Sequence, residues 1–371
     1  MNYTLPQLLK AVVDQGASDL HLTVGTPPRL RINGRLYPLD LPMLKENETR
    51  ELIYSVLTEE QKKEVEVNKE IDLAVSVKDL ARFRVNIYHQ RGQLGGAFRL
   101  VPYKIHAIKD LGLPQVLTQW CQLPRGLILI TGPTGSGKST TLAAMVDHMN
   151  ETRHDHIVTI EDPIEFIHKH KNCIVNQREV NSDTRSFSRA LKSALRQDPD
   201  VVMVGELRDL ETIQLAVTTA ETGHLVLGTL HTNSAVSTIN RLVDVFPSHQ
   251  QEQIRTQLAM NLAGVTSQLL IPSKTHGRVM AMEILVPNPA IRNLIREDKI
   301  HQVYSSMQTG QDTSGMQTMN QSLLSLVDRR MLDRETAMNK SPDQEELEAL
   351  FDRKDLGRKP PMVSGFTGGK R

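Results

Sequence analysis

Apolar and polar residues follow different patterns in the early and the later parts of the chain. In the early part they alternate along short runs, which predicts strands with one buried face. These runs lie at 19–24, 29–34, 71–77, 81–90 and 95–102. Leucines and valines at helical spacing over 2–15 predict a helix before the first strand. This part is therefore expected to form a small α+β domain.

In the later part, the apolar runs are nearly uninterrupted. Strands that are apolar on both faces are typical of a parallel sheet covered by helices on both sides. Amphipathic helical stretches separate the runs, so a doubly wound α/β domain is expected here. The runs are GLILIT at 126–131, HIVTIED at 156–162, DVVMVGE at 200–206 and HLVLGTL at 224–230.

These patterns predict an α/β protein with two domains and a tail. The α+β domain is expected at 1–100, and the doubly wound domain with its C-terminal helices at 116–340. Residues 101–115 contain two prolines and a glycine and are expected to form the linker. Residues 341–371 are polar and rich in Gly and Pro, so we expect a flexible tail that buries too little apolar surface to fold.

Composition narrows the function classes. The chain of 371 residues has 44 Lys and Arg against 43 Asp and Glu, and only 4% aromatic residues, which argues against a nucleic-acid-binding protein. The longest apolar run, at 126–130, falls far short of the ~18 residues that a membrane span needs. There is no signal-peptide pattern, and Cys121 and Cys173 are too few for a disulfide framework. We therefore expect a cytoplasmic protein that reaches a membrane only through partners.

A phosphate-binding motif follows the first uninterrupted run. GPTGSGKST at 132–140 matches G-x-x-x-x-G-K-[ST], with a predicted strand before it and a predicted helix after it. Glycines let backbone N–H groups turn inward around phosphate oxygens, and the positive end of the helix dipole points at them. The lysine would contact the β- and γ-phosphates, and the serine hydroxyl a Mg²⁺ ion. The expected nucleotide-binding residues are Gly132, Thr134, Gly135, Ser136, Gly137, Lys138, Ser139 and Thr140.

Polar residues that could complete a hydrolytic site end the other apolar runs. Glu206 ends one run and is expected near Ser139 and Mg²⁺, because the carboxyl ends of parallel strands line a common crevice. Glu161 and Glu165 follow another run; we favour one of them over Asp162 as general base, and the sequence does not choose between the two. A third run ends at His231, whose imidazole could contact the γ-phosphate.

Four motifs in series give the chain a resemblance to a known family. GPTGSGKST, TIEDPIEF, DVVMVGELRD and GTLHTNSAVSTINRL resemble the four boxes of the type II/type IV pilus secretion ATPases, and AIRNLIRE at 290–297 is similar to their retraction branch. The resemblance implies a RecA-like P-loop ATPase core, a PAS-like N-terminal domain and a homohexameric ring. It also implies ATP hydrolysis with Mg²⁺ and force delivered to a pilus through an inner-membrane platform protein. A paralogous retraction ATPase would be a further partner.

Arginines of the N-terminal domain are the expected source of additional positive charge. Strand alternation puts Arg82 and Arg84 on one polar face, and Arg99 lies on a nearby predicted strand. In the family, such arginines close over ATP, so the resemblance assigns this role to all three. Nucleotide state would then control a hinge at 101–115. Further candidates are Arg196, Arg208 and Arg241.

Three other functions remain open at this point. An assembly or secretion ATPase of the same superfamily usually carries extra N-terminal domains and a Cys-rich metal-binding insertion, which the sequence lacks. A RecA-like nucleic-acid translocase would need a basic groove with aromatic platforms, which the composition disfavours. A nucleotide sensor would bind ATP with little turnover. The four motifs are shared by the whole superfamily, and AIRNLIRE at 290–297 is the segment that favours the retraction motor.

Overall fold

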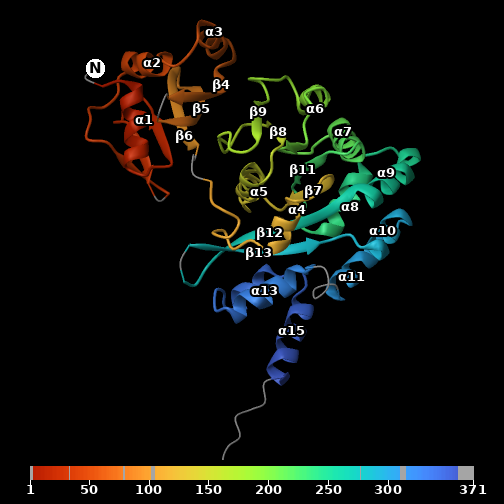
Figure 1. Ribbon diagram of the computed structural model, residues 1–371. Coiled ribbons are helices and arrows are strands. Elements are labelled where there is room, and N and C mark those ends of the chain that lie inside the picture. Colours follow the sequence, from red (N-terminus) through yellow and green to blue (C-terminus); the bar gives the residue numbers. More distant parts are fainter. Residues whose placement is uncertain are drawn as a thin grey trace, which may run out of the picture.

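The structure is a computed structural model that contains two β-sheets, one in each of two domains; in Figure 1 the N-terminal domain lies at the upper left, beside the larger domain. The predicted α/β fold class is confirmed, with a mostly parallel sheet in the larger domain and an antiparallel sheet in the N-terminal domain. Part of the expected linker and the end of the expected tail lie outside the described residues. The structure describes residues 3–32, 34–77, 80–101, 105–275, 277–309 and 315–357.

The N-terminal domain is a six-stranded antiparallel sheet in the order β3-β2-β1-β6-β5-β4, with three helices against it. Its core forms where the apolar positions of the strands meet the buried leucines of α1. Strand β5 shows the expected alternation, with Phe83 and Val85 buried and Arg84 exposed between them. The elements are α1 (Leu5–Asp14), β1 (Asp19–Leu22), β2 (Arg29–Ile32), β3 (Arg35–Pro38), α2 (Glu46–Tyr54), α3 (Glu59–Asn68), β4 (Glu70–Val77), β5 (Ala81–Gln90) and β6 (Gln93–Val101).

The larger domain is a seven-stranded sheet in the order β13-β12-β7-β11-β10-β8-β9, in which only β13 is antiparallel to its neighbour. Every residue of β7 and β11 is buried, because helices cover both faces of the sheet. The elements are α4 (Gln115–Trp120), β7 (Gly126–Thr131), α5 (Lys138–Thr152), β8 (His156–Glu161), β9 (Ile174–Glu179), α6 (Phe187–Ala194), β10 (Val201–Val204), α7 (Leu210–Glu221), β11 (Leu225–Leu230), α8 (Ala235–Asp244), α9 (Ser248–Asn261), β12 (Leu262–Pro272) and β13 (Arg278–Leu285).

The remaining helices extend below the sheet in Figure 1. Helix α10 lies against α9, and Arg292 donates to the carbonyl oxygens of Ala259, Met260 and Leu262 at the end of that helix. No helix in the described part of the chain is long and apolar enough to cross a membrane. The elements are α10 (Pro289–Arg296), η1 (Ile300–Gln302), α11 (Val303–Thr309), α13 (Met319–Asp328), α14 (Arg334–Lys340) and α15 (Gln344–Gly357).

The prediction of a flexible tail from residue 341 onwards is wrong for α15. Leu347 is fully buried and Phe351 is 6% exposed, both in a cluster with residues of β12, β13, α13 and α14. The guanidinium of Arg334 lies 4.4 Å from the centre of the Phe351 ring. These two buried side chains, together with hydrogen bonds that Glu346 accepts from Tyr304 and Asn320, hold this polar helix against the domain. Residues 358–371 lie outside the described residues.

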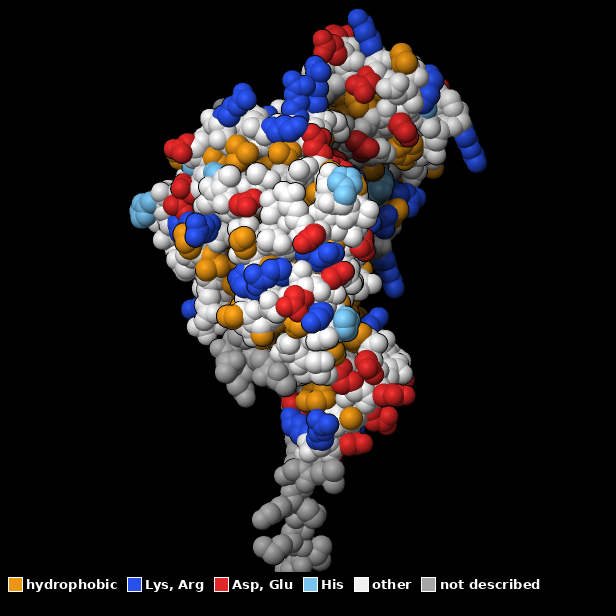
Figure 2. All heavy atoms as spheres, turned by 90° about the vertical axis from the view of Figure 1, so that its right-hand side faces the viewer, with side chains coloured by type: hydrophobic (Ala, Val, Ile, Leu, Met, Phe, Trp, Pro, Cys, Tyr) orange, Lys and Arg blue, Asp and Glu red, His pale blue; other side chains and the backbone are white. Residues whose placement is uncertain are grey.

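Charges on the face that Figure 2 shows are mixed rather than gathered into one basic surface. Acidic side chains gather at the lower end of this face, over α15, whose first turn carries Glu345 and Glu346. This face therefore gives no sign of the basic groove that a nucleic-acid translocase would need.

Phe351→Ala is expected to release α15 from the domain. Removing a buried phenylalanine costs about 3–5 kcal/mol, which is more than so short and polar a helix can lose. Limited proteolysis should then cleave the variant within 344–357 at least tenfold faster than the wild type. Glu348→Ala, at an exposed position of the same helix, is the control. Equal cleavage rates for Phe351→Ala and wild type would contradict this packing.

Candidate functional site

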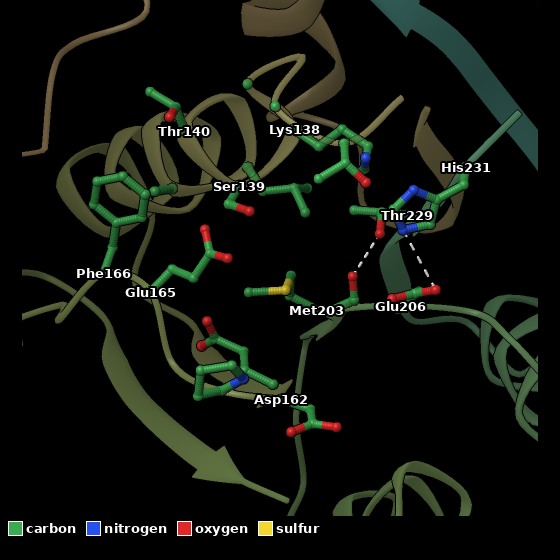
Figure 3. Close-up of a pocket in the computed structure, with 18 of the residues that line it drawn as sticks. Lys138, Ser139, Thr140, Asp162, Glu165, Phe166, Met203, Glu206, Thr229 and His231 are labelled. Carbon is green, nitrogen blue, oxygen red and sulfur yellow. Dashed lines mark hydrogen bonds and ion pairs between the residues drawn. The ribbon is translucent and has the colours of Figure 1, made fainter. Parts of the chain in front are cut away.

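A cavity of about 590 Å³ opens where the carboxyl ends of β7, β8, β10 and β11 meet (Figure 3). Its walls come from the loops after these strands, from α5, β12 and β13, and from one strand of the N-terminal domain. The structure thus brings together most of the residues that the sequence predicted as site residues. Those that line the cavity are Arg84, Thr134, Gly135, Gly137, Lys138, Ser139, Thr140, Glu161, Glu165, Glu206 and His231.

The phosphate-binding loop (residues 132–138) has a backbone conformation that only glycine allows at two positions, one near each end. Gly132 has φ 139°, and a Cβ there would lie 2.4 Å from the carbonyl oxygen of Gln268. Gly137 has φ 90° and is the residue immediately before α5. The loop therefore needs these glycines both for its backbone angles and for its close approach to β12. Gly132 and the buried Ser136 shape the loop rather than line the cavity.

The Lys138 ammonium bends back over the loop. Its Nζ donates to the carbonyl oxygens of Gly132, at 2.8 Å, and of Pro133, at 3.2 Å. Burial lowers the pKa of Lys138, while the charges of Glu206 and Glu165 oppose that change. A phosphate group that enters the loop offers this ammonium a stronger, charged partner.

A glutamine that the sequence analysis missed holds the loop from below. Gln268, on β12, is fully buried. Its Nε2 donates to the carbonyl oxygen of Ser136 at 2.9 Å, and its Oε1 accepts from Thr141 Oγ1 at 3.1 Å. The first contact holds a carbonyl oxygen of the loop, and the second holds the first turn of α5 directly after it. No local motif marks Gln268, because its partners lie more than a hundred positions away along the chain.

Glu206 is held by two cationic or potentially cationic side chains. Arg208 contacts both carboxylate oxygens, with its Nη2 and its Nε each at 2.7 Å. His231 Nε2 lies 3.4 Å from Glu206 Oε1 (Figure 3). Burial would raise the pKa of Glu206, but the hydrogen bond and charge of Arg208, with those of His231, lower it below its ordinary value. Glu206 is therefore ionised at neutral pH and next to the loop.

The two candidate general bases occupy different environments. Glu161 is 8% exposed, and its Oε1 accepts from Thr159 Oγ1 at 2.6 Å and from Gln177 Nε2 at 3.1 Å. Burial raises the pKa of Glu161 to about 6, although both hydrogen bonds oppose this. Glu165 is exposed to the cavity, and in Figure 3 its carboxylate points toward Ser139. The Asp162–Pro163 peptide bond between them is cis.

The three predicted N-terminal arginines separate in the structure. Arg84 lines the cavity, whereas Arg82 Nη2 donates to Glu179 Oε2 at 2.8 Å. Arg99 Nε donates to Asp19 Oδ1 at 2.8 Å, and Arg99 pairs in register with Arg84 on the neighbouring strand. Of the further candidates, Arg208 lines the cavity, and Arg196 and Arg241 do not belong to its lining.

Other lining residues carried no signal in the sequence. Arg278 adds a cation from β13, and Phe166 and Phe187 add aromatic rings. His168 also lines the cavity, and burial lowers its pKa to about 4, so it is neutral at physiological pH. These residues come from loops and strand ends whose meeting depends on the sheet order, which local patterns do not give.

The described residues contain no group of three or more His, Cys, Asp or Glu side chains that could hold a metal ion by themselves. Mg²⁺ does not need such a group, because it is usually bound by one or two carboxylates together with phosphate oxygens and water. The oxygen donors Ser139 and Glu206 both line the cavity, so the residues present fit a Mg²⁺ ion that arrives with a nucleotide.

Comparisons with known proteins agree with this geometry. Residues 2–337 match the family model described as "Type II/IV secretion system protein". The chain is 51% identical to the "Type IV pilus retractation ATPase PilT" of Pseudomonas aeruginosa, over 91% of this chain and 98% of that protein. It is 46% identical to a "Twitching motility protein" of Neisseria gonorrhoeae, over 93% of this chain and 92% of that protein. Among solved structures, the crystal structure of the pilus retraction motor PilT with bound ADP matches with a TM-score of 0.89 and 51% identity, over 94% of this chain and all of that one.

Gln268→Met is expected to weaken nucleotide binding at least tenfold. The substitution keeps the length and volume of the side chain but leaves the Ser136 carbonyl and the Thr141 hydroxyl without a partner, at about 1–3 kcal/mol each. Titration with a fluorescent ADP analogue would measure the dissociation constant. Gln253→Met, at an exposed position on α9, is the control. Unchanged affinity in Gln268→Met would show that the loop keeps its shape without this contact.

Glu161→Gln is expected to stabilise the nucleotide-free protein at pH 8 but not at pH 4.5. The pKa of Glu161 is raised from 4.5 to about 6 by burial, so the folded state binds this proton more tightly than the unfolded chain does. The unfolding free energy therefore falls as pH rises through this window, by about 2 kcal/mol above it. Glutamine carries no charge and keeps the acceptor oxygen. Urea unfolding at both pH values measures the difference, and the same gain at both would contradict the assignment.

Proposed function

The chain belongs to the type II/IV secretion system protein family, and on that premise we propose that it is a motor ATPase that retracts a type IV pilus. The observation that carries this proposal is that the similarity to a retraction ATPase extends over most of the chain and includes the cavity. Identity to the retraction ATPase of Pseudomonas aeruginosa is 51% over 91% of the chain, and residues 2–337, which match the family model, contain every residue that lines the cavity. The reaction is hydrolysis of ATP to ADP and phosphate, coupled to mechanical work.

The phosphate-binding loop would bind the phosphates, and Glu206 with Ser139 would bind the metal ion. Backbone N–H groups of 132–138 and the Lys138 ammonium bind the β- and γ-phosphates. Ser139 and Glu206 would hold Mg²⁺, which neutralises charge on the phosphate oxygens. Thr134, Gly135 and Thr140 complete the cradle from the loop and the first turn of α5, while the buried Ser136 shapes the loop.

We favour Glu165 as the general base. It is exposed to the cavity beside Ser139, whereas both hydrogen bonds of the buried Glu161 tie that carboxyl to its own and the neighbouring strand. A water oxygen would attack the γ-phosphorus, its proton would pass to Glu165, and the bond to the bridging oxygen would break. Glu161 then serves to position the loop. His231, which contacts Glu206, would report the loss of the γ-phosphate to β11.

The N-terminal domain supplies charge from the opposite wall. Arg84 already lines the cavity and would contact the γ-phosphate, and Arg99 lies next to it in the sheet. Release of phosphate would loosen this contact and open the hinge at 101–115. In a homohexamer at the cytoplasmic face of the inner membrane, successive openings would push a platform protein at the pilus base. A paralogous retraction ATPase is a further partner, and nucleic acid has no part in this mechanism.

Lys138→Ala is expected to lower kcat for ATP hydrolysis about 100-fold or more, because it removes preorganised positive charge from the transition state. In a piliated host without its own retraction ATPase, the wild-type chain should restore twitching, and Lys138→Ala should leave cells with pili that do not retract. Lys63→Ala, on an exposed face of α3, is the control for both assays. If the wild-type chain instead restores pilus assembly in a host without an assembly ATPase, the proposed function is wrong and the chain is an assembly ATPase.

A further inference from the structure

An ion pair joins the N-terminal domain to the larger domain outside the cavity. Arg82 comes from β5 of the N-terminal sheet, and Glu179 is the last residue of β9, the edge strand of the larger sheet. Arg82 Nη2 lies 2.8 Å from Glu179 Oε2, and the two side chains are 20% and 5% exposed. Taking both charges out of water costs free energy that their mutual attraction has to offset, and loss of one partner leaves a buried charge unpaired, which is strongly destabilising.

The same carboxylate also holds the acidic loop (residues 162–168). Glu179 Oε2 accepts from the backbone N–H of Ile164 at 2.9 Å, and Glu179 Oε1 accepts from Ser182 Oγ at 3.2 Å. Ile164 lies between the two candidate bases, one residue before Glu165. One oxygen atom therefore touches both the N-terminal domain and the loop that carries the general base.

Gln177, two residues earlier on β9, holds the rest of this loop. Its Nε2 donates to Glu161 Oε1 at 3.1 Å and to the carbonyl oxygen of Phe166 at 2.8 Å. Its Oε1 accepts from the backbone N–H of His168 at 2.8 Å. Residues two apart on a strand share a face, so Gln177 and Glu179 form one polar surface on which the acidic loop is laid. Of these two residues, Glu179 is the one that accepts a hydrogen bond from Arg82.

The spacing of the arginines connects this contact with the cavity. Arg82 and Arg84 lie two positions apart on one face of β5, which places their Cα atoms about 7 Å apart. Arg82 is bound to Glu179, and Arg84 lines the cavity. Fixing the position of Arg82 therefore also limits where Arg84 can lie. Arg82 Nε is buried without a hydrogen-bond partner in the described structure, so the docked guanidinium is not fully hydrogen-bonded.

We propose that Glu179 is a positioning residue that couples docking of the N-terminal domain to the shape of the acidic loop, with Arg82 as its partner. The inference rests on the proposed ATPase function and deepens it. When the domain docks, Arg82 neutralises Glu179, Ile164 keeps its acceptor, and Arg84 enters the cavity. When the domain leaves, Glu179 becomes an unpaired buried carboxylate that draws water toward the loop. Glu165 and Arg84 are thus brought into place by one event.

The test combines kinetics with hydrogen exchange on the full chain. Glu179→Gln keeps an acceptor oxygen for Ile164 but removes the charge that binds Arg82, and Arg82→Gln removes the partner without touching the loop. We expect each variant to lower kcat about tenfold while KM for ATP changes less than threefold. The double variant should be no worse than either single one, because both remove the same interaction. Amide exchange over 162–168 should be about tenfold faster in Arg82→Gln.

The matched control is Glu66→Gln, which breaks an Arg50–Glu66 pair of the same 2.8 Å length inside the N-terminal domain and should change neither kcat nor the exchange of 162–168. Additive losses of kcat in the double variant, or unchanged exchange of 162–168 in Arg82→Gln, would overturn the proposal. If the variants change only the rate at which the domains separate and keep a normal kcat, the Arg82–Glu179 pair is a structural contact, and the proposal is overturned. If the wild type fails to hydrolyse ATP, the proposed function fails, and the exchange experiment still decides the coupling.

Discussion

The site depends on the carboxyl ends of parallel strands meeting at one edge of the larger sheet. Strands β7, β8, β10 and β11 each end in the cavity, and each delivers a different group there: the phosphate-binding loop, the acidic loop, Glu206 and His231. These segments are spread over more than a hundred positions of sequence. The strands pair in parallel with a defined register, so the loops that follow them begin at the same edge of the sheet. The chemistry is therefore set by sheet order before any side chain is considered.

Differences in environment then give three carboxylates of one type three different properties. Burial raises the pKa of Glu161 to about 6, while Arg208 and His231 outweigh burial at Glu206 and lower its pKa. Glu165 stays open to the cavity. A buried carboxyl tied by hydrogen bonds suits positioning, an ionised one beside the loop suits a hard cation, and an accessible one suits proton transfer. Three neighbouring glutamates can thus take different roles in one site, because each has a different environment.

The sequence predicts those parts of the fold and site that depend on local patterns. Uninterrupted apolar runs gave the parallel strands, and the glycine spacing gave the phosphate-binding loop, because both signals lie within a few consecutive residues. Gln268 escaped prediction because its two contacts span 132 and 127 positions and no motif surrounds it. Helix α15 escaped because its composition is polar, and its order comes from Leu347 and Phe351 meeting a surface formed elsewhere. Long-range contacts of this kind follow from the assembled sheet and not from composition.

The N-terminal arginines show how one pattern serves two purposes. Alternation on β5 puts Arg82 and Arg84 on the same face, and the sequence offered no reason to distinguish them. The difference arises from what each one meets: Arg82 reaches the end of edge strand β9, and Arg84 reaches the open end of the central strands. Both arginines belong to the same strand, and the proposed mechanism therefore has Arg82 help to place Arg84 near the phosphates. In the coupling proposed above, docking therefore reaches the cavity through the geometry of β5, and no contact between nucleotide and linker is needed.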